Sequence, residues 1–112
     1  MDCLFCKIAA GDIPSKKVYE DDAVYAFYDI DPKAPVHFLI IPKQHIPSVN
    51  GLTAQNSGVV AHIFTVIAQV AKELRLDNGY RVVTNVGDDG GQTVEHLHFH
   101  VLGARPLAWP PG

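Results

Sequence analysis

Residues 95–102 read Glu-His-Leu-His-Phe-His-Val-Leu, and this alternation of histidine with apolar residues constrains the fold more than any other segment. Successive side chains of a β-strand point to opposite faces of its sheet. A strand over 95–102 therefore places His96, His98 and His100 on one face, with neighbouring imidazoles about 6.6–6.8 Å apart along the strand. The apolar residues between them face a core on the other side. We predict a half-buried strand whose open face carries imidazole groups.

The remaining hydrophobic pattern predicts an α+β fold with four more strands, at residues 17–20, 23–28, 36–41 and 80–84. Apolar residues recurring every three or four positions predict one long helix over 53–75, with Thr53 as its N-cap. The apolar stripe of this helix consists of Val59, Val60, Ile63, Phe64, Ile67, Val70, Ala71 and Leu74. This order of elements favours an antiparallel sheet of about five strands covered by the helix, with an exposed edge that invites a second copy.

Size and composition limit the class of protein. The 112 residues suit a single domain, 1–112, and 47% hydrophobic against 19% charged residues excludes disorder as the main state. The net charge of −3 and the absence of a basic cluster argue against binding of nucleic acid. The chain has no run of 18 apolar residues, and its N-terminus lacks a signal-peptide pattern. We therefore expect a cytoplasmic protein that binds no membrane.

Three imidazoles on one face suit more than one chemistry. A neutral imidazole can attack phosphorus, donate a hydrogen bond or bind a metal ion. The glycine-rich segment 87–91 predicts a loop whose backbone can approach a phosphate closely, and Asn85, Gln92 and Thr93 flank it with side-chain donors. The alternatives are a solvated polar face that happens to use histidine, and a metal site built on the His-x-His spacing.

The other cysteines and histidines add a second candidate cluster. Cys3 and Cys6 form a Cys-x-x-Cys pair, which fits a metal site, a redox pair or two reduced thiols. The pattern predicts no helix N-terminus at the first cysteine, and this disfavours the redox reading. His62 lies off the apolar stripe of the helix, so we expect a solvated side chain there.

The segment His96-Leu97-His98-Phe99-His100-Val101-Leu102 resembles the signature of the histidine triad superfamily, in which three histidines alternate with apolar residues. The similarity extends along the whole chain. Further matching segments are Asp29-Ile30, Pro35-Val36-His37-Phe38, Ile41-Pro42-Lys43-Gln44-His45, Gly79-Tyr80-Arg81, Gly90-Gly91-Gln92-Thr93 and Trp109-Pro110-Pro111-Gly112. The Trp-Pro-Pro-Gly ending is similar to the purine nucleoside phosphoramidase branch of the nucleotide-binding proteins. The resemblance implies a HIT-like fold with a short N-terminal helix and a sheet extended across a homodimer.

The resemblance also implies a mechanism. His98 would attack the α-phosphorus of a purine nucleoside 5′-phosphoramidate and form a nucleotidyl-histidine, which water then hydrolyses. The carbonyl group of His96 would hold the other imidazole proton of His98. His100 would contact the phosphate with His37 behind it, and both are candidates for moving protons. No cofactor is required for this catalysis.

Binding residues follow from the same resemblance. Asp29 would accept hydrogen bonds from the ribose hydroxyl groups, and an apolar slot would hold the purine. The residues of that slot are Phe5, Ile8, Ile13, Phe27 and Ile30. Asn85, Gly91, Gln92 and Thr93 would lie at the phosphate or leaving group, and Trp109 would reach the active site of the partner subunit. Some family members carry a structural zinc ion, for which this chain supplies Cys3, Cys6, His45 and His96.

Three other functions compete with the phosphoramidase. A nucleotide-binding interaction module would hydrolyse its ligand only incidentally, and it needs no nucleophile. A metal-dependent hydrolase would use the three strand histidines as ligands. A dinucleoside polyphosphate hydrolase would cleave a P–O–P bond in place of a P–N bond.

Overall fold

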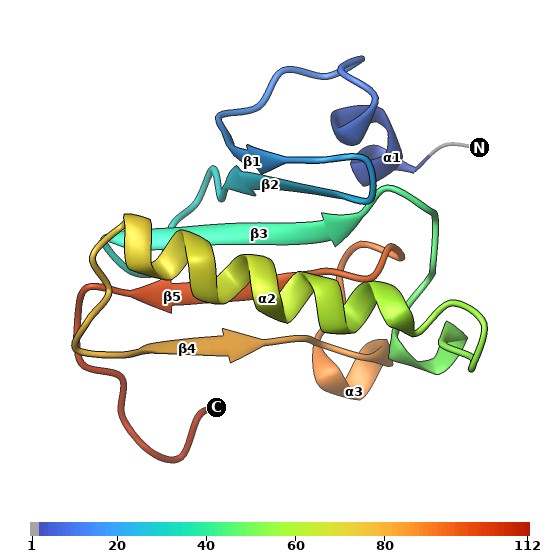
Figure 1. Ribbon diagram of the computed structural model, residues 1–112. Helices are drawn as coiled ribbons and strands as arrows, with labels where there is room; N and C mark the ends of the chain where they lie inside the picture. Colours follow the sequence, from blue (N-terminus) through green and yellow to red (C-terminus); the bar gives the residue numbers. More distant parts are fainter. Residues whose placement is uncertain (1–2) are drawn as a thin grey trace.

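The computed structural model describes residues 3–112 as an antiparallel sheet with helices on both of its faces (Figure 1). The described elements, in chain order, are α1 (Leu4–Ala9), β1 (Lys17–Glu20), β2 (Val24–Tyr28), β3 (Val36–Pro42), the 3-10 helix η1 (Val49–Gly51), α2 (Gly58–Glu73), β4 (Tyr80–Val83), α3 (Gly87–Gly90) and β5 (Phe99–Gly103). Five strands pair antiparallel in the order β1-β2-β3-β5-β4. The predicted α+β class and the strand number are confirmed.

Helix α2 lies across one face of the sheet and covers the main core (Figure 1). Its buried residues are Ile63, Val66, Ile67, Val70 and Ala71. They pack against the even-numbered side chains of β3, such as Phe38 and Ile40, and against Phe99 and Val101 of β5. The apolar half of the histidine strand therefore contributes to this core, as its alternation predicts.

A second apolar cluster forms on the opposite face of the sheet, beside the short helix α1. The cluster contains Phe5 and Ile8 of α1, Tyr25 and Phe27 of β2, and Leu39 and Ile41 of β3. Helix α1 begins after Cys3, whose side chain caps it by accepting a hydrogen bond from the backbone nitrogen of Cys6. The prediction of no helix N-terminus at the first cysteine is therefore wrong, because the residues after Cys3 pack an apolar face on the sheet. The two faces of the sheet are thus unequal, and the histidines lie on the α1 face.

Several predicted boundaries are wrong. Helix α2 begins at Gly58 because residues 53–57 form a separate turn, in which Thr53 Oγ1 accepts hydrogen bonds from the backbone nitrogens of Gln55 and Asn56. Phe64 belongs to the predicted apolar stripe, yet its side chain is 46% exposed. The predicted loop at 87–91 contains the helical turn α3.

The last strand begins at Phe99 and not at residue 95. The last residue pair between β3 and β5 is Ile40 with Phe99. Two residues further along β3 is Pro42, which has no N–H to donate a hydrogen bond to a neighbouring strand, and the pairing ends before it. The carbonyl oxygen of Pro42 accepts a hydrogen bond from His96 Nε2 instead, at 2.8 Å. His96 therefore lies in a bend before the strand.

Among the helices of residues 3–112, none has the length and apolar character that crossing a membrane requires.

Candidate functional site

His96, His98 and His100 lie on the α1 face of the sheet, although only His100 is within β5. His98 Nδ1 donates a hydrogen bond to the carbonyl oxygen of His96 at 2.7 Å. A carbonyl oxygen can only accept, so neutral His98 carries its proton on Nδ1 and has a lone pair on Nε2. Thr84 Oγ1 donates to the carbonyl oxygen of His98 at 2.8 Å, which ties this segment to the residue after β4.

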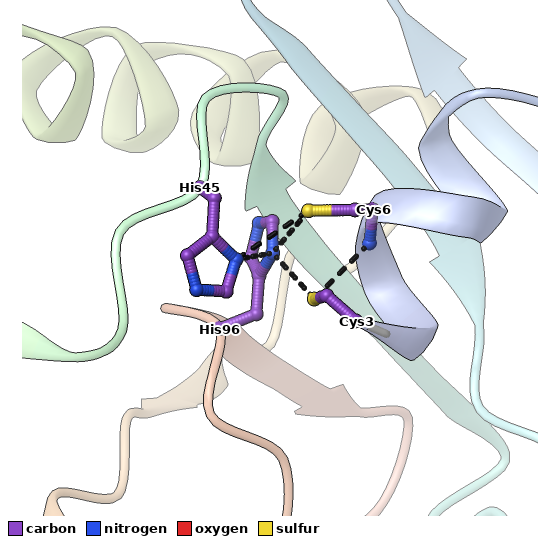
Figure 2. A group of neighbouring side chains, drawn as sticks. All are labelled: Cys3, Cys6, His45 and His96. Atoms are coloured by element: carbon purple, nitrogen blue, oxygen red, sulfur yellow. Dashed lines mark hydrogen bonds between the residues drawn. The ribbon is translucent and has the colours of Figure 1, made fainter. Parts of the chain in front are cut away.

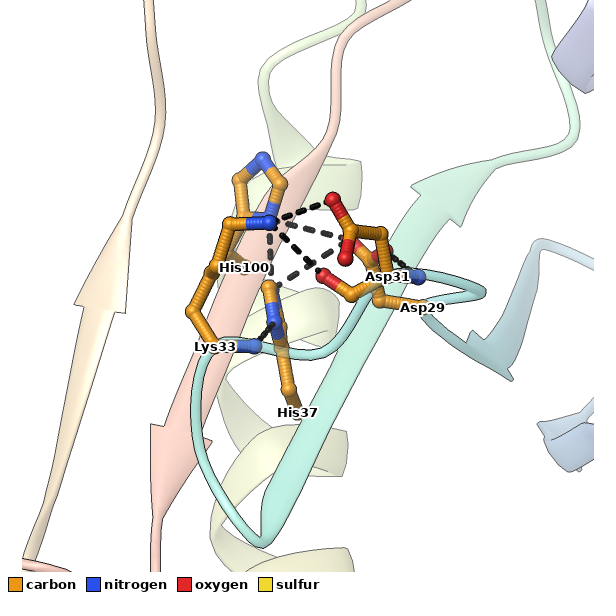
Figure 3. A network of polar contacts seen from close by, with 5 residues as sticks. All are labelled: Asp29, Asp31, Lys33, His37 and His100. Carbon is orange, nitrogen blue, oxygen red and sulfur yellow. Dashed lines mark hydrogen bonds and ion pairs between the residues drawn. The ribbon is translucent and has the colours of Figure 1, made fainter.

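His100, His37 and Asp29 lie close together (Figure 3). His37 lies on β3, and its Nε2 is 2.9 Å from His100 Nδ1 and 3.4 Å from Asp29 Oδ2. The rings of His98 and His100 are 5.1 Å apart between centroids. The arrangement joins an imidazole that could act as nucleophile, two further imidazoles and a carboxylate within one small region.

Burial keeps these imidazoles neutral. It lowers the pKa of His98, and it lowers the pKa of His37 despite the nearby carboxylate of Asp29. Burial, together with the neighbouring His98 and His37, lowers the pKa of His100 to about 4. An imidazole attacks only through an unprotonated nitrogen, so this environment suits nucleophilic chemistry at neutral pH.

An open groove of about 740 Å³ begins at His37 and Asp29. Its lining residues are Pro14, Ser15, Lys16, Tyr28, Asp29, Ile30, Pro32, Pro35 and His37. Of the predicted purine slot, Ile30 is fully exposed and Ile13 is half-buried. Phe5, Ile8 and Phe27 are buried in the cluster beside α1. The rings of Phe5 and His98 are nearly perpendicular to each other, with centroids 5.0 Å apart.

In the glycine-rich segment, the side chain of Gln92 makes its hydrogen bonds within the protein. Gln92 Nε2 donates to the carbonyl oxygens of Pro47 and Val94, and Gln92 Oε1 accepts from the backbone nitrogen of Gly87. Gly91 ends α3 with φ of +80°, a conformation that favours glycine. Asn85 is half-buried and Thr93 is exposed. Gln92 therefore shapes this segment through its side chain, while the predicted contacts with phosphate stay predictions.

The four predicted zinc ligands converge on one point from three separate parts of the chain (Figure 2). Cys3 and Cys6 come from the start of α1, His45 from the loop after β3, and His96 from the bend before β5. His96 Nδ1 is 3.2 Å from Cys3 Sγ, 3.5 Å from Cys6 Sγ and 3.3 Å from His45 Nδ1. Cys6 Sγ is 3.4 Å from His45 Nδ1.

Trp109 is 82% exposed, so its predicted role in a partner's site stays a prediction. The tail that carries it is attached to the sheet, because Arg81 Nη2 donates to the carbonyl oxygen of Ala108 at 2.9 Å.

Sequence reasoning missed two polar contacts. The backbone nitrogen of Lys33 donates to His37 Nδ1 at 3.0 Å, so a loop residue contacts a site histidine. The turn residues Asp31 and Pro32 were a signal that the chain bends back here. The expectation that His62 is solvated is only partly right: its side chain is 42% exposed, but its Nε2 is 2.7 Å from Asp21 Oδ2. That contact joins α2 to the turn between β1 and β2. In the sequence, His62 lies on the polar side of the helix, and this position is the same for a solvated histidine and for one that contacts another segment.

Comparisons with known proteins agree with this geometry. The HIT domain model matches residues 10–107 of the chain. The chain is 49% identical over 111 residues to an uncharacterised HIT-like protein of Synechococcus elongatus, covering 99% of this chain and 97% of that protein. A HIT family hydrolase from Legionella pneumophila Philadelphia 1 superimposes with a TM-score of 0.97 at 48% identity, covering 99% of this chain and 100% of that one. A histidine triad protein from Clostridium difficile superimposes with a TM-score of 0.94 at 51% identity, covering 96% of this chain and 95% of that one. The chain therefore belongs to the HIT domain family, whose solved structures include proteins named as hydrolases.

Proposed function

We propose that this protein hydrolyses the P–N bond of purine nucleoside 5′-phosphoramidates through a nucleotidyl-histidine intermediate. The observation that carries the proposal is the state of His98. Burial holds its imidazole neutral, the carbonyl oxygen of His96 fixes the proton on Nδ1, and Nε2 therefore has the lone pair. A pure binding module has no need for a nucleophile oriented in this way.

The reaction has two steps. His98 Nε2 forms a bond to the α-phosphorus while the P–N bond of the substrate breaks, and the amine leaves after gaining a proton. Water then attacks the phosphorus and loses a proton, the bond to Nε2 breaks, and the nucleoside monophosphate is released. His100, on β5, lies beside His98, which precedes that strand, and their ring centroids are 5.1 Å apart, so His100 would be a second imidazole close to the phosphoryl group.

Recognition of the nucleoside is assigned to Asp29 and the groove beside it. A carboxylate can accept hydrogen bonds from both the 2′- and 3′-hydroxyl groups of ribose. Asp29 Oδ1 already accepts from the backbone nitrogen of Asp31, which holds the carboxylate in place at the groove. The exposed Ile30 side chain, which lines this groove, supplies apolar surface for a purine ring.

The test is hydrolysis of adenosine 5′-phosphoramidate by chelated protein, with a dinucleoside polyphosphate assayed in parallel. We expect turnover of the phosphoramidate by wild type and none by His98→Ala. Faster cleavage of the P–O–P substrate would favour the dinucleoside polyphosphate hydrolase. Nucleotide binding without turnover would favour the interaction module. Loss of turnover on chelation, with the fold intact, would favour the metal-dependent hydrolase.

We also propose that Cys3, Cys6, His45 and His96 hold a structural zinc ion. Typical Zn–N and Zn–S bond lengths in a tetrahedral site separate two nitrogens by about 3.3 Å, and a nitrogen from a sulfur by about 3.6 Å. The distances here are 3.3 Å between His45 Nδ1 and His96 Nδ1, and 3.2–3.5 Å between nitrogen and sulfur.

The protonation of His96 supports the same proposal. Its Nε2 donates to the carbonyl oxygen of Pro42, so the lone pair of neutral His96 is on Nδ1 and points at the two sulfurs. The ion would join α1 to the bend before β5 and perform no chemical step. Metal analysis should find about one zinc per chain in wild type and much less in Cys6→Ser. Reduced thiols of this kind fit the cytoplasmic location predicted above.

We propose a homodimer as the working form. Both edge strands, β1 and β4, have a side without a strand neighbour within the described chain. The exposed aromatic residues are Phe64, Tyr80 and Trp109, a set that favours burial against a second copy. Light scattering should give twice the 12.2 kDa chain mass.

A further inference from the structure

The loop that precedes β3 controls which nitrogen of His37 carries a proton. The backbone nitrogen of Lys33 donates to His37 Nδ1 at 3.0 Å. A backbone N–H can only donate, so His37 Nδ1 must be unprotonated, and neutral His37 carries its proton on Nε2. Figure 3 shows the Lys33 nitrogen on one side of the His37 ring and His100 on the other.

The proton on His37 Nε2 determines the protonation of His100 in turn. These two rings meet through His37 Nε2 and His100 Nδ1, which are 2.9 Å apart. Because His37 Nε2 is the donor, His100 Nδ1 is the acceptor, and neutral His100 carries its proton on Nε2. Asp29 Oδ2, 3.4 Å from His37 Nε2, lies where it also favours a proton on that nitrogen.

The backbone of Lys33 is also held on the side of its carbonyl group. The carbonyl oxygen of Lys33 accepts hydrogen bonds from Arg105 Nε and Nη2, at 3.1 and 2.9 Å. The start of the loop is held at Asp29, whose backbone nitrogen donates to the carbonyl oxygen of His37 at 3.0 Å. The N–H that faces His37 therefore belongs to an anchored loop and not to a freely moving one.

We infer that the backbone N–H of Lys33 sets the tautomers of His37 and His100, so that His100 presents Nε2–H as a hydrogen-bond donor and His37 acts as a positioning residue. This inference deepens the proposed function, on which its catalytic part rests. Burial lowers the pKa of both histidines, so the neutral tautomers are the relevant forms at neutral pH.

The protonation order limits what the pair can do. The Nε2–H of His100 can donate a hydrogen bond to a phosphoryl oxygen and stabilise the negative charge that develops there. The neutral His37–His100 pair cannot release a net proton to a leaving amine. The hydrogen bonds run from His100 through His37 to the backbone N–H of Lys33, and this amide does not give up its proton to replace one that the pair loses. The amine must then gain its proton from water or from a group outside this pair.

The same order bears on metal binding. Asp29, His37 and His100 offer three ligand atoms that lie within 4.8 Å of one another, an arrangement that could hold a metal ion. His37 Nε2 has no lone pair when Nδ1 accepts from Lys33. The pattern thus disfavours a catalytic metal ion at these residues.

The first test needs no substrate. Nitrogen-15 chemical shifts of imidazole rings distinguish protonated from unprotonated nitrogens, and two-bond correlations to the ring protons identify each one. At neutral pH we expect His37 and His100 to be protonated on Nε2 and unprotonated on Nδ1. A proton on Nδ1 of either ring, or averaging between the two nitrogens, would overturn the inference. This measurement stays decisive even if wild type proves to have no P–N activity.

The second test separates positioning from proton carriage. His37→Gln places an amide N–H near the position of Nε2 and cannot carry a proton, whereas His37→Asn places its amide near Nδ1. If His37 only positions His100, His37→Gln should lose less than tenfold in kcat, while His37→Asn and His37→Ala lose about a hundredfold or more. If His37→Gln is as slow as His37→Ala, the histidine carries protons and the inference fails.

Discussion

Asp21, in the turn between β1 and β2, accepts four hydrogen bonds, and its removal is the sharpest stability test that the structure offers. The backbone nitrogens of Ala23 and Val24 donate to Oδ1 at 2.8 and 3.0 Å. Tyr19 Oη donates to Oδ2 at 2.8 Å, and His62 Nε2 of α2 is 2.7 Å from the same oxygen. One carboxylate thus joins the turn, β1 and the covering helix.

The magnitude follows from this count. Each hydrogen bond contributes a net 0.5–1.5 kcal/mol or so, and the Asp21 side chain is 27% exposed, so water partly replaces lost bonds. We therefore expect Asp21→Ala to lower the free energy of unfolding by about 2 kcal/mol, near the low end of the sum. For a chain of this size that corresponds to a fall in Tm of about 8–10 °C. The exposed neighbour Asp22 provides the matched control, and Asp22→Ala should change the free energy of unfolding by less than about 0.5 kcal/mol.

The pH dependence has a definite sign. Burial opposes ionisation of Asp21, but the hydrogen bonds from His62 and its other donors outweigh it and hold the pKa of Asp21 well below its usual range. A depressed carboxyl pKa contributes stability above the unfolded value of about 3.9, and the contribution is lost as the pH falls further. Urea unfolding at pH 7 should show the full difference between wild type and Asp21→Ala, and at pH 3 a smaller one.

A double-mutant cycle with His62→Ala isolates the contact with the helix. We expect a coupling free energy of about 0.5–1 kcal/mol between Asp21 and His62. Equal stability of Asp21→Ala and Asp22→Ala at pH 7, or a coupling of zero, would refute this account of the turn.

Three further predictions concern the site. The pKa of His100 is lowered to about 4 in the folded protein, so the unfolded chain binds more protons than the folded one between about pH 6.5 and 4. The free energy of unfolding should therefore fall as the pH drops through that range. In urea unfolding of chelated protein, His100→Gln should show a smaller fall than wild type. Chelation should lower the Tm of zinc-loaded wild type by several degrees and leave Cys6→Ser unchanged in thermal melts, whereas equal shifts in both proteins would count against a zinc site on these ligands. Gln92→Ala removes the bridge to Gly87 and Pro47 and should cost about 1–2 kcal/mol in urea unfolding, with faster amide hydrogen exchange confined to residues 87–91.

The parts of the fold that follow from periodicity could be predicted from the sequence. Alternation around His98 assigns one face to imidazole and the other to the core, and both assignments hold for the described chain. The helical stripe identifies α2, although Phe64 at its edge is exposed. The α+β class follows from these patterns because each element has only one apolar face to bury.

The rest depends on contacts between distant segments. The strand begins late because Pro42, distant in sequence, cannot pair with the residues before Phe99. The hydrogen bond from Lys33 to His37 depends on the course of a loop, and no side-chain pattern marks a backbone donor. Boundaries and protonation states are therefore properties of the assembled structure, and periodicity alone does not determine them.

His96 links the two halves of the site in a way that decides how they can be separated. Its Nδ1 faces Cys3 and Cys6, while its carbonyl oxygen holds the Nδ1 proton of His98. A substitution at His96 removes a zinc ligand and also shifts the backbone that orients the nucleophile, so its effects on stability and on turnover cannot be assigned to either role. Cys6→Ser leaves the His96 carbonyl group and its contact with His98 in place. The cysteine variant, and not the histidine variant, therefore reports what the metal site alone contributes.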